Sequence, residues 1–394
     1  MRQRHPTTGS AVVSAALCHW VVCQLALSDY KQSVPAVMLA RLLLLACATR
    51  RSLSFVTQRC DEAPSDETVR KALLDNLPGQ DLLLARLVDS LHSPLPRRVR
   101  RRRHPAAIDY HCRPFYGDED TPGVRGGKRE AGTNFFWTFA TLALLTPGQR
   151  YVLALVAVPK GQPPAETVAL LLAQAERSGV PLRYLLLDKG FYDGETIALL
   201  QGRGIRFVVP LVRRGDEEKL GGTTRFFRRD CWTGWCAHGW TAEPRRVDEQ
   251  TGKVRRLQKI EVRVSVCVLN RGERGNWVFA AWGIDWPPGM VARRYRTRFG
   301  IETSYRQLGQ VLACTTSKDG RVRLLLVGLA LLLRQYACCV EQQQRSRWWW
   351  AEVPRGQRVR LGELVLWLVL ELARLLDFRR DPPKLPDIPP FTAA

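Results

Sequence analysis

The sequence lacks the cysteine pattern of a structural zinc site or of a disulfide framework. Its 394 residues contain eleven cysteines, an odd number, and no two of them are spaced as in a Cys-x-x-Cys pair. Structural zinc sites are built on such closely spaced pairs, and disulfide frameworks use an even number of cysteines. We therefore expect reduced thiols in a cytosolic compartment.

Acidic residues are scarce relative to basic ones. The chain has 37 Asp and Glu against 60 Lys and Arg, which gives a formal net charge of +23. This excess predicts a polyanionic partner, of which nucleic acid is the commonest and an anionic membrane surface the alternative. Arginine dominates the basic residues and favours bidentate contacts with phosphate.

Long apolar runs are also missing. A bilayer span needs roughly 18–20 apolar residues, so the shorter runs are expected to form buried helices and no membrane partner is predicted. The apolar segment 11–27 resembles a signal peptide, but His19 and Gln24 interrupt it and no small-residue cleavage site follows. We expect a cytoplasmic, nucleoid-associated protein. The shorter runs lie near residues 36–48, 324–333 and 364–376.

Residues 1–95 are predicted to form an N-terminal helical domain. Apolar residues recur at helical spacing in Ala36–Ala48 and Leu82–Leu91, and Ser65 or Asp66 is placed to cap a helix between them. Such a domain in a basic protein is either a reader of DNA ends or a packing domain without base contacts. The sequence leaves both interpretations open.

Residues 96–105 read as a linker rich in arginine. The segment PLPRRVRRRR, from Pro94 to Arg103, carries six arginines. A run of this kind is usually a solvated tether, and here it is also suited to lie along phosphates.

Residues 106–211 alternate between strand and helix patterns, which predicts a mixed α/β sheet flanked by helices. This is the first part of the predicted catalytic core. The expected strands are Ala106–Tyr110, Phe135–Leu145, Tyr151–Val158, Leu182–Leu187 and Ile205–Leu211, and the expected helices are Ala165–Arg177 and Glu195–Gln201.

The pattern changes again at residues 212–290, which we interpret as a β-rich insertion. Lys259–Leu269 alternates apolar and polar residues as a half-exposed strand does, and Asn276–Ile284 is a suitable partner for it. Residues 291–376 are predicted to complete the core, with closing helices at Arg321–Val340 and Gly362–Leu376. A Pro-rich tail, residues 377–394, follows.

Three acidic residues occur where the predicted elements could bring them together. Asp109 is expected to end one apolar strand and Asp188 another, and Glu302 lies on a predicted helix that spans residues 295–309. Tyr295 and Arg298 share one helical face with Glu302, because Arg298 follows Tyr295 by three residues and Glu302 follows it by seven. Ligand sites of α/β proteins lie at the carboxyl ends of strands. Three carboxylates there would suit two Mg²⁺ or Mn²⁺ ions and in-line phosphoryl transfer.

The combined motifs resemble those of DDE transposases of bacterial and archaeal insertion sequences, in the group with a β-strand insertion before the glutamate helix. That group carries Tyr, two residues, Arg, three residues, Glu, six residues and Lys on this helix. The chain matches the pattern over roughly residues 100–340. The matching residues are Tyr295, Arg298 and Glu302, then Asp188, Gly190 and Phe191, and finally Asp109, Tyr110, His111, Pro114, Phe115, Tyr116 and Gly117.

The resemblance implies a ribonuclease-H-like core, dependence on Mg²⁺, and catalysis by Asp109, Asp188 and Glu302. It also implies that Tyr295 and Arg298 help to hold DNA beside the cleaved phosphodiester. Gly309 occupies the position of the signature lysine. Arg306, one helical turn beyond Glu302, is predicted to supply a DNA-binding cation in its place.

Other residues have both functional and structural interpretations. Lys189 could contact phosphate or be a solvated loop lysine, and His111 could be a ligand or hold the backbone of a loop. The aromatic and basic segment Arg225–Trp240 could stack on DNA bases or fill the core of the insertion. Trp348–Trp350 could form a DNA-backbone or partner patch, or a hydrophobic anchor. The GGTT segment at 221–224 lacks the lysine of a nucleotide-binding loop.

The sequence therefore predicts a transposase that cleaves DNA and transfers strands at the ends of an insertion sequence. Its expected partners are the double-stranded terminal inverted repeats, the target DNA and a second copy of the chain. One alternative is a transposase-derived DNA-binding protein with impaired catalysis. The other is a nuclease of the same fold without strand transfer.

Overall fold

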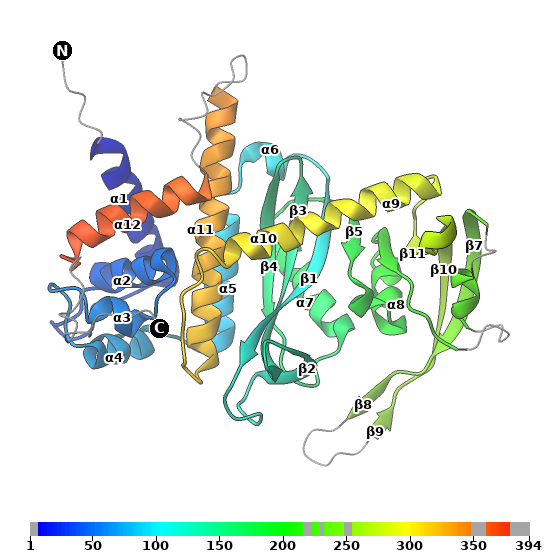
Figure 1. The fold of residues 1–394 in the computed structure, drawn as a ribbon, viewed down its shortest axis with the longest axis horizontal. Helices are drawn as coiled ribbons and strands as arrows, with labels where there is room; N and C mark the ends of the chain where they lie inside the picture. The colour runs from blue at the N-terminus through cyan, green and yellow to red at the C-terminus, as the bar shows by residue number, and fades with distance from the viewer. Residues whose placement is uncertain (1–6, 216–221, 229–231, 248–253, 348–359, 379–394) are drawn as a thin grey trace, which may run out of the picture. The chain divides into compact units, whose positions relative to one another are not determined.

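The computed structural model describes residues 7–215, 222–228, 232–247, 254–347 and 360–378 (Figure 1). The chain divides into two compact units. Unit 1 consists of Met1–Arg86, Gln310–Ala330 and Val359–Ala394, and unit 2 consists of Leu87–Gly309 and Leu331–Arg358. The Pro-rich segment from residue 379 onward and Trp348–Trp350 lie outside the described residues.

Unit 2 is built on a mixed sheet, which in the described part of the chain has nine strands in the order β2-β3-β1-β5-β6-β11-β10-β7, with β4 paired to β3. β1 lies antiparallel to β3 and parallel to β5, and β5 is parallel to β6. The strands are β1 (His104–Phe115), β2 (Val124–Glu130), β3 (Thr133–Thr146), β4 (Gln149–Ala157), β5 (Leu182–Leu187), β6 (Phe207–Pro210), β7 (Gly234–Ala242), β10 (Ile260–Leu269) and β11 (Trp277–Trp282).

Helices flank this sheet. α7 (Pro164–Arg177) packs against β3 and β4, and α8 (Gly194–Gly202) packs against β10. β3 is buried almost without interruption from Phe136 to Thr146, as expected for a strand covered on both faces. The expectation of a mixed α/β sheet flanked by helices is confirmed, and the arrangement is that of a ribonuclease-H-like core.

The predicted β-rich insertion extends this same sheet. β11 pairs antiparallel with β6, and β10 pairs with β11 and β7. The expected pairing of the two strands near residues 260–282 is therefore confirmed. A separate two-stranded ribbon, β8 (Arg245–Val247) with β9 (Val254–Arg256), projects from the end of β7 (Figure 1).

The segment before and through Glu302 is helical but not one regular helix. It consists of α9 (Pro288–Arg296), the 3₁₀ turn η4 (Thr297–Phe299) and α10 (Gly300–Leu308). The single helix predicted over 295–309 is therefore corrected to two helices joined by a tighter turn. The turn contains Arg298 and comes directly before the helix that carries Glu302.

Two further expectations need correction. Asp109 does not end its strand, because β1 continues to Phe115 and pairs with β3 throughout. The arginine-rich stretch is not wholly a solvated tether, because it contains the short helix α6 (Arg97–Arg100). Within it, Arg100 donates to the carbonyl oxygens of Leu95, His92 and Ser178.

Unit 1 is helical in its described part. Of the two predicted capping residues, Ser65 and Asp66, it is Ser65 that caps α4, by accepting from the backbone N–H of Thr68. α1 and α2 pack against each other and against α12. Its helices are α1 (Thr7–Leu25), α2 (Ala36–Thr49), α3 (Leu53–Thr57), α4 (Asp66–Asn76) and α12 (Leu361–Leu375), with parts of α5 (Gln80–His92) and α11 (Gly320–Arg347).

The apolar runs form helices, but one is longer than expected. Within the described residues, Gly320–Gln342 of α11 is long and apolar enough to cross a membrane by length and composition. The expectation that every run falls short of that length is wrong for this helix. Because 78% of its apolar window is buried inside the protein, the helix has the character of a core helix. Gln335 ties it to the sheet through hydrogen bonds with both backbone groups of Val152.

The domain boundaries proposed from the sequence stay a prediction. Unit 1 takes in α12 and residues 310–330, which the sequence pattern had assigned to the closing part of the core. The ten described cysteines are free thiols.

Candidate functional site

Asp109 and Asp188 are brought together by the register of two neighbouring parallel strands. β1 pairs with β5 up to Ile108 opposite Leu187, so the next residue on each strand is one of the two aspartates. Both side chains are half-buried rather than fully enclosed: 14% of the Asp109 side chain and 34% of the Asp188 side chain is exposed. The pair therefore lies where β1 and β5 stop pairing, at the carboxyl end of β5, while Asp109 itself still pairs with Thr141 of β3.

Arg298 bridges the two aspartates. Its Nη1 lies 3.1 Å from Oδ2 of Asp109 and its Nη2 lies 3.3 Å from Oδ1 of Asp188. Only 6% of the arginine side chain is exposed. Burial by itself would lower the pKa of Arg298, but Tyr295 and the two carboxylates outweigh it and raise that pKa. The guanidinium is thus a buried cation held by the two aspartates.

Two tyrosines fix the backbone beside this ion pair. The phenol of Tyr295 donates to the carbonyl oxygen of Leu187 at 3.1 Å, and the phenol of Tyr305 donates to the carbonyl oxygen of Asp109, also at 3.1 Å. The Tyr305 hydroxyl also lies 2.8 Å from that of Thr141 on β3. Burial raises the pKa of both phenols, so they are neutral hydrogen-bond donors.

The side chains of Tyr295 and Arg298, which were predicted to face DNA, are buried. They are 6% and 5% exposed and make the contacts just described. Both lie beside the two aspartates, but they point into the protein. A direct contact with DNA stays a prediction that needs Arg298 to change partners.

Glu302 lies in the first turn of α10, four residues after Arg298. Its side chain is not among those the structure describes. Among the described residues no group of three His, Cys, Asp or Glu side chains could hold a metal ion. The two aspartates are oxygen donors of the kind that Mg²⁺ and Mn²⁺ prefer. The donor set therefore fits a divalent cation in its chemistry, and Glu302 is its predicted third member.

The end of α10 carries the departure from the transposase signature. Gly309 caps the helix, and Arg306 is exposed. Tyr305, and not Arg306, is the residue of this turn that reaches the site. A contact of the exposed Arg306 with DNA stays a prediction.

Tyr305 and Thr141 were missed in the sequence. A signal for Tyr305 was available, because it continues the stripe of Tyr295, Arg298 and Glu302 by a further three residues. Thr141 gave no local signal. It becomes part of the site because β3 pairs it with Asp109.

The surroundings of His111 agree with a structural role. Its ring stacks on that of Tyr305 with centroids 4.8 Å apart, and burial, reinforced by Arg113, lowers the pKa of His111 to about 4. Lys189 is exposed, in agreement with a solvated loop lysine.

Within the segment Arg225–Trp240, core packing accounts for Trp240. Its ring stacks on His238 with centroids 5.4 Å apart and lies 5.6 Å from the ring of Tyr192. Trp232, in contrast, is 57% exposed. Stacking on DNA bases stays a prediction, and Trp232 is the exposed ring that is available for it.

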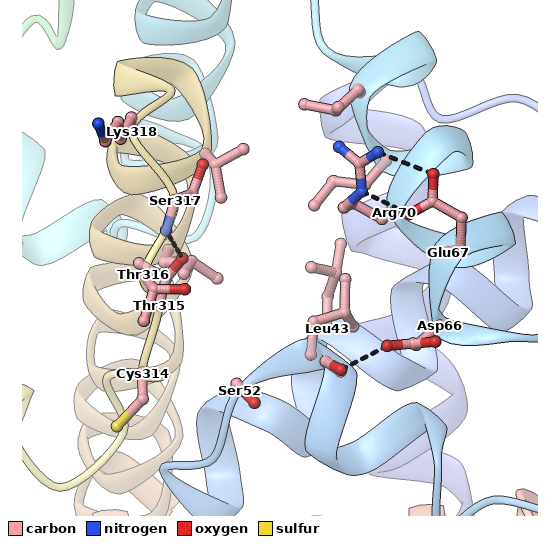
Figure 2. A pocket seen from close by; sticks show the side chains of 16 residues that line it. Leu43, Ser52, Asp66, Glu67, Arg70, Cys314, Thr315, Thr316, Ser317 and Lys318 are labelled. Carbon is pink, nitrogen blue, oxygen red and sulfur yellow. Dashed lines mark hydrogen bonds and ion pairs between the residues drawn. The ribbon is translucent and has the colours of Figure 1, made fainter.

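A cavity of about 610 Å³ lies in unit 1, and neither Asp109 nor Asp188 lines it. Figure 2 shows the segment Cys314–Lys318 along one wall, and Asp66, Glu67 and Arg70 on the opposite wall. Glu67 and Arg70 pair with each other at 2.8 Å. None of the site residues predicted from the sequence lines this cavity.

Comparison with known proteins agrees with the fold and with the resemblance. A family model described as "Transposase DDE domain" matches residues 88–334, which is more than half of the chain. The chain belongs to this family of transposases.

A solved structure of a piggyBac transposase synaptic complex with hairpin DNA is similar in fold, with a TM-score of 0.53. The similarity covers 95% of this chain and 80% of that chain at 10% sequence identity. No curated protein matches the sequence.

Proposed function

We propose that this transposase cleaves DNA at the ends of an insertion sequence and transfers the cut strands, using Asp109, Asp188 and Glu302. The observation that carries the proposal is the ion-pair geometry of the first two residues. They come directly after the last paired residues of the neighbouring parallel strands β1 and β5, and they contact one guanidinium at 3.1 and 3.3 Å. That guanidinium belongs to the turn that leads into the helix of Glu302.

The three carboxylates hold Mg²⁺, with Mn²⁺ as a substitute. When bound, divalent cations supply activation of a water or a 3′-hydroxyl and stabilise the leaving oxygen in an in-line displacement. The protein's part is positioning. Tyr305 and Thr141 fix the backbone at Asp109, and Tyr295 fixes the carbonyl that comes directly before Asp188.

Double-stranded DNA is the substrate, both as terminal inverted repeats and as target. Two features support this assignment: the net charge of +23, and a structural relative that was determined with hairpin DNA. Arg306 serves as a surface phosphate contact in place of the signature lysine. Arg298 and Tyr295 act at the cleaved phosphodiester, and the helical segment 1–95 reads the DNA end.

Two copies of the chain pair the two element ends, since transposition joins both ends to one target. The protein acts in the cytoplasm on nucleoid DNA. A nuclease of the same fold would share the site and lack only strand transfer. A transposase-derived binding protein would bind the ends without cleaving them.

The decisive variant is Asp188→Asn, which keeps the side-chain shape and removes the charge. We expect it to lower Mg²⁺-dependent cleavage of the element end by on the order of 10³-fold or more, because carboxylates of one site act as a unit. DNA binding, measured by fluorescence anisotropy, should stay within about threefold of the wild type, because the basic surface is unchanged.

If the wild-type protein binds the element end and never cleaves it, the proposed catalysis is wrong. The chain is then a transposase-derived DNA-binding protein. If the protein cleaves DNA but forms no joined products, it is a nuclease of the same fold that lacks strand transfer.

A further inference from the structure

Arg298 occupies the position of a counter-cation between the two aspartates. One guanidinium neutralises one of the two negative charges, at 3.1 Å from Asp109 and 3.3 Å from Asp188. The other oxygen of Asp109, Oδ1, accepts from the backbone N–H of Tyr110 at 3.0 Å. Both oxygens of Asp109 therefore already accept hydrogen bonds within the protein.

A divalent cation that enters this site meets an electrostatic obstacle. It needs the same carboxylates, and it repels the guanidinium that now holds them. Arg298 is 5% exposed, so moving it off the aspartates separates a buried cation from the two carboxylates that hold it at 3.1 and 3.3 Å. Removing one partner of a buried ion pair is strongly unfavourable for this reason.

A phosphate group removes that obstacle, because a guanidinium binds phosphate as well as it binds carboxylate. We propose that Arg298 competes with the metal ion for Asp109 and Asp188, and that a DNA phosphate releases the competition by taking over Arg298. Metal binding is then weak in the free protein and strong in the DNA complex. This inference rests on the proposed function and adds to it an order of assembly, in which DNA binding favours metal loading.

The coupling is reciprocal. If DNA raises the affinity for the metal ion by some factor, the metal ion raises the affinity for DNA by the same factor. Allosteric couplings in proteins commonly lie between roughly 5-fold and 150-fold. We expect about tenfold or more here, because the competing groups are in direct contact.

The first test measures Mn²⁺ binding to the DNA-free protein by isothermal titration calorimetry. Arg298→Met removes the competing charge and keeps a side chain of similar length, and it should bind Mn²⁺ about tenfold more tightly than the wild type. Arg293→Met is the matched control: it makes the same change of charge at an exposed position of α9 and should leave Mn²⁺ affinity unchanged. Equal or weaker binding by Arg298→Met would overturn the inference.

The second test uses the wild-type protein, so it does not depend on the folding of a variant. Mn²⁺ affinity is measured with and without a short DNA duplex of arbitrary sequence, and DNA affinity with and without Mn²⁺. Equal increases of about tenfold are expected in both directions. Mn²⁺ binding that DNA leaves unchanged would refute the competition while keeping the metal site. Absence of Mn²⁺ binding in every protein, with and without DNA, would instead refute the metal site of the proposed function.

Discussion

Two arginine ion pairs in unit 2 differ in burial more than in distance. Arg246 contacts both oxygens of Glu195 at 2.7 and 2.8 Å, closer than Arg298 lies to either aspartate. Yet 37% of the Arg246 side chain is exposed, against 6% for Arg298. The shorter pair is screened by water, and the longer one is not. Burial, and not distance, should therefore decide what each arginine contributes to stability.

The largest effect is expected from Arg298→Met in metal-free buffer. The change removes the guanidinium that bridges two neighbouring carboxylates, so the free energy of unfolding should fall by about 3 kcal/mol. Urea unfolding in the presence of a chelator measures this value. A loss no greater than that of Arg246→Met would show that burial does not distinguish the two pairs.

A second effect comes from His111, a half-buried residue close to the same site whose Nε2 atom is enclosed. Its Nε2 has no hydrogen-bond partner among the described residues, and its pKa is lowered from 6.5 to about 4. The unfolded chain therefore takes up a proton between pH 6.5 and pH 4 while the folded protein does not. This difference favours unfolding as the pH falls, and it should remove about 2 kcal/mol of stability across that window.

His111→Phe keeps the stacking on Tyr305 and removes the titration. The decrease in stability between pH 6.5 and pH 4 should accordingly be about 2 kcal/mol smaller in the variant, as measured by urea unfolding at several pH values. Identical pH profiles for the two proteins would place the ring in contact with water.

A smaller effect is expected from Tyr305→Phe. It deletes the hydroxyl that binds the carbonyl oxygen of Asp109 and the side chain of Thr141, both in a partly buried setting. The expected loss is about 1–2 kcal/mol in the free energy of unfolding. Thr141→Val is the complementary change, and the two losses should not add, because they share one hydrogen bond. Simple additivity would argue against the contact.

The smallest effect belongs to Arg246→Met, at less than about 1 kcal/mol. Because this pair is partly exposed, its contribution should decrease further as salt is raised, whereas that of Arg298 should change little. Unfolding at low and at high salt measures both. If the contribution of Arg246 to the free energy of unfolding does not change with salt, its ion pair is not screened by solvent as expected.

Much of the core was predictable because its pattern is local. The strand Leu182–Leu187 was predicted with the bounds that the structure gives it, and Asp188 followed it as expected. Apolar runs of this length, bounded by turn residues, carry their structure in their own sequence. Placing both aspartates side by side where β1 and β5 stop pairing then needed only the general rule for α/β proteins.

The elements that were predicted wrongly depend on contacts with residues far away in the sequence. The polar residues after Ile108 resemble a loop, and they remain a strand because β3 pairs with them up to Phe115. The β2 strand was missed because it is exposed and rich in glycine and charge. Near Glu302, a Cβ on Gly300 would lie 2.5 Å from Nη2 of Arg150. This close approach to a residue far away in the sequence accompanies the break between α9 and α10.

The central claim is that Asp109, Asp188 and Glu302 share one metal site. Fe²⁺ can be bound in place of Mg²⁺ and activated with peroxide, so that locally produced radicals cut the protein backbone beside the metal. Mapping of the fragments by mass spectrometry should find cuts near all three residues, reduced by excess Mg²⁺ and lost in Asp188→Asn. Cuts near Asp109 and Asp188 but none near Glu302, or cuts that persist in Asp188→Asn, would contradict the three-carboxylate site.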